Sequence, residues 1–280
     1  MWSELVPLAF NFASIETKVI LQLGDWVTDR IRVEVDGPIK TITLTRSDKR
    51  NALDTAMLDA LEEQFVAEPD TADRLIVLRA EGPSYCAGVD MRERLEKGVQ
   101  SKESPVERVF RAMEANPLPI VTAVEGPAIA GGCELALHCE FVIASQEASF
   151  GMSLAQLGMA PSWFLAKKLM ELTGPVATRE ILLLGDPVPA QWMFDRGLIA
   201  RLASADQVDM ELAKIVDTLS ANAPLSLKAM KALIIRQLDY RDDIHHEDVD
   251  TLLQEARQSD DSKEGVRARL EKRKANFTGT

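Results

Sequence analysis

This chain of 280 residues is poor in cysteine, histidine and aromatic side chains, and these shortages exclude several classes of protein. Its three cysteines, Cys86, Cys133 and Cys139, are an odd number without C-x-x-C spacing. Neither a disulfide framework nor a zinc site is therefore expected. The three histidines form no metal-ligand pattern, since His245 and His246 lie among acidic residues typical of a solvated helix. A reducing cytoplasm fits this composition.

An excess of positive charge is also absent, because 44 acidic residues against 32 basic ones give a net charge of −12. Such a balance opposes nonspecific association with nucleic acid or anionic membrane. The apolar stretch at 5–12 follows Glu4 rather than a basic segment and is far shorter than the ~20 residues that span a bilayer. We expect no nucleic-acid or membrane partner, and we treat residues 1–28 as an N-terminal extension.

The sequence does contain strands that alternate with helices. Alternating apolar residues over 31–35 and 39–45 flank a Gly-Pro turn and predict a hairpin. Helical spacing over 53–65 precedes the apolar run at 75–78, which is typical of a strand buried on both faces. The beginning of the chain therefore has the order β-β-α-β.

The alternation continues as far as about residue 160, and helices follow. We expect a helix over 107–116, a strand over 120–124, a glycine-rich turn over 126–132 and a strand over 141–144. From Pro161 onward the pattern is helical, with a stop predicted at Gly174-Pro175 and another at Gly185. These patterns divide the chain into an α/β core over 29–203 and a charged helical region over 204–280.

Three stretches, 82–90, 126–134 and 150–161, place glycine where the backbone comes close to another group. Ala130-Gly131-Gly132 precedes a helix predicted to begin near Cys133, so free N–H groups and the positive end of the helix dipole point out of the turn. The 82–90 stretch can present the N–H of Val89 in the same way. Either loop alone is also explained as a turn, but together they predict an oxyanion site.

Several segments, in order from Asp29 to Gly279, carry a family resemblance. They are R-S-D-K-R-N-A-L at 46–53, Y-C-A-G-V-D-M at 85–91, A-V-E-G-P-A-I-A-G-G-C-E-L-A-L-H-C-E at 123–140, Ala190 with G-L-I at 197–199, and E-K-R-K-A-N-F at 271–277. Together they resemble the crotonase (enoyl-CoA hydratase/isomerase) superfamily, and the 123–140 segment is the most specific match.

The resemblance implies an α/β fold with a crotonase-like ββα spiral core and a C-terminal helical oligomerisation region. It further implies an acyl-CoA thioester substrate, no cofactor apart from the coenzyme A of that substrate, and a homotrimer or hexamer. In this family the thioester carbonyl is held by two backbone N–H groups, which correspond to Val89 and Gly131. Glu134 corresponds to the first of two catalytic glutamates, although a carboxylate in a first helical turn also simply stabilises the helix dipole.

Coenzyme A contacts are implied at positions that match the family, some through the backbone and some through cations. For any one of the cations, ordinary surface charge is the alternative explanation, and Asp90 can instead be structural. The implied positions are Lys49, Arg50, Ala52, Ala87, Asp90, Lys272, Arg273 and Lys274.

The sequence departs from the family at the second glutamate, where Leu154 stands. Hydration of a conjugated thioester needs groups that deprotonate water and manage a proton at the α-carbon, and leucine does neither. The nearby replacements Ser153, Gln156, Ser162, Asp90 and His138 are unconvincing, and packing explains His138 better than catalysis. Trp163 is explained equally well as a pocket wall or as packing.

The leading hypothesis is an acyl-CoA enzyme of the hydratase/isomerase group that stabilises a thioester enolate. Because of Leu154, two alternatives stay open: an acyl-CoA decarboxylase or C–C hydrolase of the same superfamily, and a non-catalytic acyl-CoA-binding protein.

Overall fold

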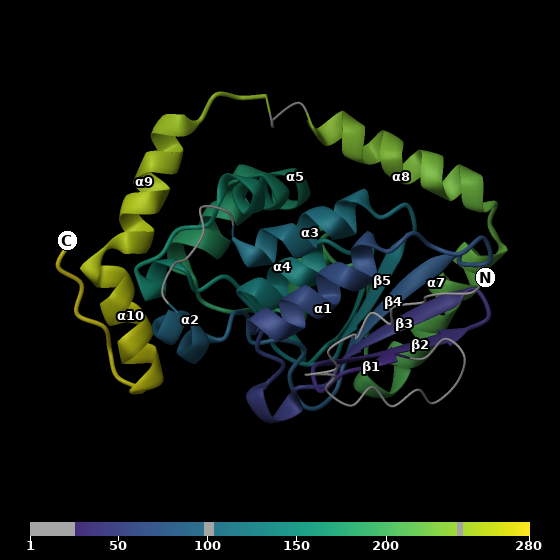
Figure 1. Cartoon of the computed structure of the whole chain (residues 1–280), viewed down its shortest axis with the longest axis horizontal. Helices are drawn as coiled ribbons and strands as arrows, with labels where there is room; N and C mark the ends of the chain where they lie inside the picture. Colours follow the sequence, from purple (N-terminus) through teal and green to yellow (C-terminus); the bar gives the residue numbers. More distant parts are fainter. Residues whose placement is uncertain (1–25, 98–103, 240–242) are drawn as a thin grey trace, which may run out of the picture.

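The computed structural model describes residues 26–97, 104–239 and 243–280, so most of the predicted N-terminal extension lies outside the described part of the chain (Figure 1). Its centre is a seven-stranded sheet in the order β1-β2-β3-β4-β5-β7-β10. The strands are β1 (Trp26–Val27), β2 (Ile31–Asp36), β3 (Ile39–Leu44), β4 (Leu75–Ala80), β5 (Ile120–Val124), β7 (Phe141–Ser145) and β10 (Arg201–Ala203).

The predicted β-β-α-β order is observed. Strands β2 and β3 pair antiparallel, with Ile31 opposite Leu44, and Gly37 in the turn adopts a φ of 55°. Strand β3 pairs parallel with β4, and every later pair in this sheet is parallel. Strand β1 pairs antiparallel with β2, so residues 26 and 27 of the expected N-terminal extension add a short strand to the core sheet.

Strand β4 is buried on both faces, as its continuous apolar run predicts. Ile76 and Leu78 face the larger core, whereas Leu75 and Val77 face a second cluster. The larger core is covered by helices α1 (Thr55–Val66) and α3 (Pro105–Ala115) and by the short helix α4 (Gly131–Leu137). Helix α1 begins at Asp54, whose carboxylate accepts the N–H of Met57 at 2.9 Å.

Helix α7 (Val208–Ala221) covers the opposite face of the sheet. Its apolar stripe packs on β4, β5 and β7 because the buried residues recur every three to four positions: Val208, Leu212, Ile215, Val216 and Leu219. Helix α7 thus packs on the core sheet, although it lies beyond the boundary expected at residue 204.

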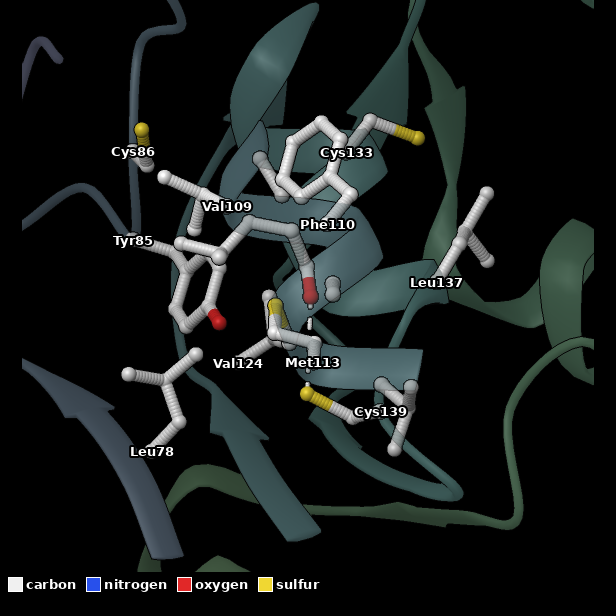
Figure 2. Close-up of a cluster of buried hydrophobic side chains, with 14 of the residues drawn as sticks. Leu78, Tyr85, Cys86, Val109, Phe110, Met113, Val124, Cys133, Leu137 and Cys139 are labelled. Atoms are coloured by element: carbon white, nitrogen blue, oxygen red, sulfur yellow. Dashed lines mark hydrogen bonds between the residues drawn. The ribbon is translucent and has the colours of Figure 1, made fainter. Parts of the chain in front are cut away.

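The larger core contains all three cysteines, buried and free (Figure 2). Cys139 donates to the carbonyl of Leu135 at 3.4 Å. Burial raises the pKa of the Cys86 and Cys133 thiols to about 12, so neither is a thiolate at neutral pH. These cysteines pack as small apolar side chains.

A second sheet, in the order β6-β8-β9, lies beside the glycine-rich turn. It consists of β6 (Ala128–Ile129), β8 (Ser149–Gly151) and β9 (Val188–Pro189). Backbone pairing of Cys86 with Ala128 ties it to the 82–90 stretch. The two loops predicted to converge are thus joined through β6.

The remaining helices follow the predicted helical region. The predicted stop at Gly174-Pro175 is confirmed, because Gly174 is non-helical, with a φ of 68° and a ψ of 177°, and divides α5 (Trp163–Arg179) into two helical segments. The second segment leads into η3 (Glu180–Leu184). The others are α2 (Met91–Lys97), α6 (Ala190–Asp195), α8 (Pro224–Leu238), α9 (Glu247–Gln258) and α10 (Asp260–Leu270), with short turns η1 (Ser47–Lys49), η2 (Ala155–Leu157) and η4 (Ala205–Gln207).

The C-terminal helices α9 and α10 return to the core beside α2, whereas α8 extends along the other side of the molecule (Figure 1). Helix α10 lies against η2 at backbone contact distance. A Cβ on Gly265 would be 2.4 Å from the carbonyl oxygen of Leu157, and one on Gly158 would be 2.6 Å from that of Asp261. This close approach brings α9 to the site described below. Within the three described ranges, no helix is long and apolar enough to cross a membrane.

Candidate active site

Two loops meet beside the first turn of α4. The N–H of Leu53 donates to Gly88 at 2.8 Å, and the N–H of Asp90 donates back to Leu53 at 2.9 Å. On the other side, the N–H of Ile129 donates to Cys86 at 2.9 Å. The segment between Cys86 and Asp90 is therefore held by backbone bonds on both sides.

The backbone amides of Val89 and Gly131 lie close together at this junction. A Cβ built on Gly131 would be 3.7 Å from the nitrogen of Val89, and one built on Gly88 would be 3.1 Å from the nitrogen of Gly131. Neither amide donates to another residue in the described part of the chain, and both residues line a cavity. Two free N–H groups facing one cavity can hold a single oxyanion.

Residues 130 and 132 show how the backbone reaches this geometry. Ala130 has a φ of 49° and a ψ of −120°, a conformation that favours glycine, and its N–H donates to Gly151 at 2.7 Å. A Cβ on Gly132 would be 2.2 Å from the carbonyl oxygen of Cys86, so only glycine fits there. The helix begins at Gly131, two residues before the predicted start.

Glu134 lies in the first turn of α4, as predicted, and lines the same cavity. Although its side chain faces the cavity, it lies deep in the protein. The pKa of Glu134 is raised from 4.5 to about 8. Desolvation by burial is the largest cause, the charge of nearby Glu107 acts in the same direction, and Arg257 opposes the shift. The carboxyl is therefore mostly protonated at neutral pH and can exchange a proton with a bound molecule.

Glu107 is a site residue that sequence reasoning missed. It lies in the first turn of α3, lines the cavity and is close enough to Glu134 for its charge to affect the pKa of that carboxyl. The sequence contained only a weak indication, an acidic residue at the start of a predicted helix. Packing of α3 beside α4 creates the pair.

Apolar side chains form much of the remaining wall of this cavity, which has a volume of about 420 Å³. Leu154 lines it, so the residue at the position of the missing glutamate does face the site. Ser162 also lines the cavity, and its hydroxyl caps α5 by accepting the N–H of Leu165 at 3.3 Å. The other apolar residues of the wall include Leu58, Val106 and Met159.

Charged side chains from α2 and α9 line the same cavity: Glu93, Arg94, Lys97 and Arg257. Lys97 pairs with Glu93 at 2.6 Å. Burial lowers the pKa of Arg94, and the positive charge of Arg257 lowers it further. Sequence reasoning missed both arginines, because they are 163 positions apart (94 and 257) in regions without a motif.

The residues predicted to bind coenzyme A through the first loop lie near the junction. The N–H of Ala87 donates to Arg50 at 3.0 Å and that of Ala52 donates to Lys49 at 3.1 Å, so these segments are adjacent. The side chains of Lys49 and Arg50 are exposed. This arrangement is compatible with binding to an anion outside the cavity.

Asp90 has a structural part in the fold. Its carboxylate accepts from Arg46 at 2.9 Å and from the N–H of Arg92 at 3.0 Å. Burial alone would raise the pKa of Asp90, but Arg46 and the N–H groups of Glu93 and Arg92 outweigh burial and lower it. Asp90 thereby stabilises the start of α2.

The C-terminal cations do not line the cavity. Lys272 and Lys274 are exposed, while Arg273 is held by Glu264 at 2.5 and 2.8 Å and by Glu271 at 2.6 Å. Within this chain they are not brought together with Lys49 and Arg50 around the described cavity.

The other residues considered as replacements for the missing glutamate have different partners. Ser153 accepts from Arg269 at 3.1 Å, and Gln156 donates to Asp186 at 2.8 Å. His138 is packed between Phe110 and Phe164, with its Nδ1 2.8 Å from the carbonyl of Glu134. Burial lowers the pKa of His138 to about 3. Packing is therefore its role, as the sequence favoured.

Trp163 stacks on His246, with ring centroids 4.3 Å apart, and does not line the cavity as the structure describes it. Of its two interpretations, packing is the one that the structure supports. His246 is also 3.0 Å from Asp250. In the described ranges, no cluster of three or more histidine, cysteine or acidic residues is arranged to hold a metal ion.

The fold and this site define a class of α/β protein in which backbone N–H groups and a buried carboxyl face one cavity. Residues 34–280 match the family model described as enoyl-CoA hydratase/isomerase, so the chain belongs to this family. It is 29% identical to the crotonyl-CoA hydratase of Syntrophomonas wolfei over 262 residues, which cover 89% of this chain and 98% of the relative.

Solved structures confirm the crotonase fold. The chain resembles a methylmalonyl-CoA decarboxylase in complex with 2-nitronate-propionyl-CoA, with a TM-score of 0.84, 24% identity and coverage of 90% of this chain and 99% of the other. It also resembles an enoyl-CoA hydratase of Mycobacterium smegmatis, with a TM-score of 0.70, 31% identity and coverage of 88% and 98%. Family membership supports an enzyme with an acyl-CoA thioester as its class of substrate.

Proposed function

We propose that this protein is an enoyl-CoA hydratase/isomerase in which the amides of Val89 and Gly131 hold the thioester carbonyl oxygen. Both N–H groups are free, adjacent and at the cavity wall. Proton transfer at the α-carbon or water addition places negative charge on that oxygen, and one preorganised donor contributes roughly 3 kcal/mol to stabilising such charge. The substrate carries the coenzyme A, and no other cofactor is required.

The pairing of Glu134 with Glu107 is the observation that carries hydration. Two carboxyls that line one cavity can act as acid and base in one reaction. In this proposal ionised Glu107 removes a proton from water as the oxygen bonds to carbon 3 of the enoyl group. Protonated Glu134 then delivers its proton to carbon 2 of the enolate, and the pair compensates for Leu154.

Isomerisation uses the same N–H groups but only one carboxyl, Glu134, which both removes and returns the proton. Ionised Glu134 removes a proton from carbon 2 of a 3-enoyl thioester, the charge moves onto the carbonyl oxygen, and the proton returns at carbon 4. The two reactions differ in the protonation state of Glu134 that starts the cycle. Because its pKa is about 8, kcat/KM for hydration falls as the pH rises through 8, whereas kcat/KM for isomerisation rises.

Mass spectrometry of 2-enoyl-CoA and 3-enoyl-CoA incubated with the protein in deuterated water tests this function. Gain of water establishes a hydratase, and double-bond migration with deuterium uptake establishes an isomerase. Glu134→Gln is expected to lower turnover about 100- to 10,000-fold while coenzyme A binding is retained. Full activity of this variant excludes the proposed role of Glu134.

Decarboxylation is the second candidate, and Leu154 favours it. Because the apolar Leu154 lines the cavity, no glutamate at that position repels a carboxylate of the substrate. When a thioester that carries a carboxylate on its α-carbon loses carbon dioxide, the electron pair of the broken bond forms an enolate on the same two N–H groups, and Glu134 protonates the α-carbon. Turnover of malonyl- or methylmalonyl-CoA, with no change in either enoyl-CoA, supports this reaction. Cleavage of a β-ketoacyl thioester indicates a C–C hydrolase, and binding without any turnover indicates a non-catalytic protein.

We also propose that the protein assembles as a homotrimer or hexamer through its C-terminal helices. Helix α8 exposes a group of large apolar side chains, although Lys231 on it is buried and pairs with Glu140 at 3.0 Å. An exposed apolar patch of this kind is typical of an interface. The exposed residues are Leu225, Met230, Leu233 and Ile234. Light scattering after size exclusion tests the assembly, and a monomer at micromolar concentration contradicts it.

A further inference from the structure

The cavity holds two arginines for which the proposed proton transfers have no use. Arg94 comes from α2 and Arg257 from α9, and both line the cavity together with Glu134. Arg257 is close enough to both Arg94 and Glu134 for its charge to lower the pKa of each group. Two like charges brought together in this way destabilise each other unless an anion lies between them.

No carboxylate of the described part of the chain pairs with either arginine within ion-pair distance. The nearby Glu93 is already bound to Lys97 at 2.6 Å and accepts the N–H of Thr55 at 2.8 Å. Within the described ranges, the two arginines thus line the same cavity without an ion-paired carboxylate.

The charges of the cavity wall leave a positive balance. Glu93 offsets Lys97, and the buried carboxyl of Glu134 is mostly protonated at neutral pH. The negative charge of Glu107 can offset one of the two arginines, Arg94 and Arg257, but not both. One positive charge is left, which matches a ligand group with a single negative charge.

We propose that Arg94 and Arg257 bind a carboxylate at the far end of the acyl chain, so that the substrate is an ω-carboxyacyl-CoA. This inference rests on the proposed function, because it takes the acyl group to lie in the cavity beside Glu134. The apolar wall, including Val106, Leu154 and Met159, suits the methylene groups between the thioester and the carboxylate. A planar guanidinium binds a carboxylate through two parallel N–H bonds.

The phosphates of coenzyme A are the competing anion. They are expected outside the cavity, near the exposed Lys49 and Arg50, whereas Arg257 acts on the carboxyl that exchanges protons with the acyl carbons. If the arginines bound phosphate instead, their removal would weaken free coenzyme A and every thioester equally.

Calorimetric binding to matched saturated thioesters tests the proposal: succinyl- against butyryl-CoA, glutaryl- against valeryl-CoA and adipyl- against hexanoyl-CoA. These probes lack a double bond, so binding is measured independently of hydration or isomerisation. At least one diacid is expected to bind about 10- to 100-fold more tightly than its neutral match. Arg94→Met and Arg257→Met are each expected to abolish most of this preference while leaving the neutral thioester within about threefold.

Arg92→Met is the matched control, because Arg92 is exposed on the same helix and does not line the cavity. It is expected to keep the full preference. Equal affinity for diacid and neutral thioesters, or loss of free coenzyme A binding in both cavity variants, overturns the proposal. Absence of turnover on enoyl thioesters with the diacid preference intact would instead contradict only the proposed reaction.

Discussion

The two ends of the cavity are built differently. At one end, backbone N–H groups of Val89 and Gly131 are brought together by loops that follow strands β4 and β5, where glycine permits close approach. At the other end, side chains from α2, α3 and α9 meet, including Arg94, Glu107 and Arg257. In the proposed function, the backbone end serves any thioester, whereas the side-chain end determines which acyl group fits and which reaction follows.

The largest combined effect on turnover and stability is expected from distorting the backbone end. Gly132→Ala would place a Cβ 2.2 Å from the carbonyl oxygen of Cys86, which separates the two loops. We expect kcat/KM to fall about 100-fold or more for every thioester, because an oxyanion donor is displaced. We also expect a loss of about 1–3 kcal/mol in the free energy of unfolding.

Gly131→Ala is the matched comparison for this variant. Its Cβ would be 3.1 Å from the end of the Leu53 side chain, and the backbone atoms of Gly88 and Val89 would be at 3.5 and 3.7 Å, so a smaller loss of stability is expected. Steady-state kinetics and urea unfolding of both variants measure the two effects. Unchanged turnover in Gly132→Ala would show that the spacing of the loops does not matter.

Glu134 links the two ends, and its protonation also affects stability. Its folded pKa of about 8 lies above the ordinary 4.5, so the folded state retains a proton that the unfolded chain releases. The resulting stabilisation is complete below pH 4.5 and is lost as the pH rises to about 8. Between pH 5 and 8, we expect the wild type to lose about 3 kcal/mol relative to Glu134→Gln. Parallel unfolding curves at all pH values would contradict the raised pKa.

Glu107→Gln tests the side-chain end. We expect hydration to slow by about 10- to 100-fold, because the group that activates water is lost. The pKa of Glu134 should also fall, since the charge of Glu107 raises it. The decline of kcat/KM with rising pH would then begin at lower pH. Glu96→Gln, at an exposed position of α2 outside the cavity wall, is the control and should leave the pH profile unchanged.

The smallest expected effect is a gain in stability at the backbone end. Ala130 adopts a φ of 49° and a ψ of −120°, which costs an alanine roughly 1–3 kcal/mol. Ala130→Gly should remove this strain and raise the free energy of unfolding by about 1 kcal/mol after the added flexibility of glycine in the unfolded chain is counted. Thermal unfolding measures the change, and a lower midpoint would show that the alanine methyl contributes more through packing.

The backbone end was largely predictable from sequence. Strand β4 and the hairpin β2-β3 follow from apolar periodicity, and the amides of Val89 and Gly131 follow from glycine-rich turns after strands together with the family motifs. The helix break at Gly174 was also predictable, because glycine followed by proline ends a helix locally. Local patterns do not show which elements pack together, and α7 packs on the core sheet across the boundary expected at residue 204.

By itself the sequence determined the α/β alternation, the family, the two glycine-rich loops, Glu134 in a first helical turn and the absence of a glutamate at Leu154. Only the tertiary structure decided that Glu107 stands beside Glu134 and that Arg94 and Arg257 share their cavity. Local patterns report hydrogen bonding and burial over a few residues. A pKa of about 8 and a net charge on a cavity wall instead arise from groups far apart in the chain, which only packing brings within electrostatic range.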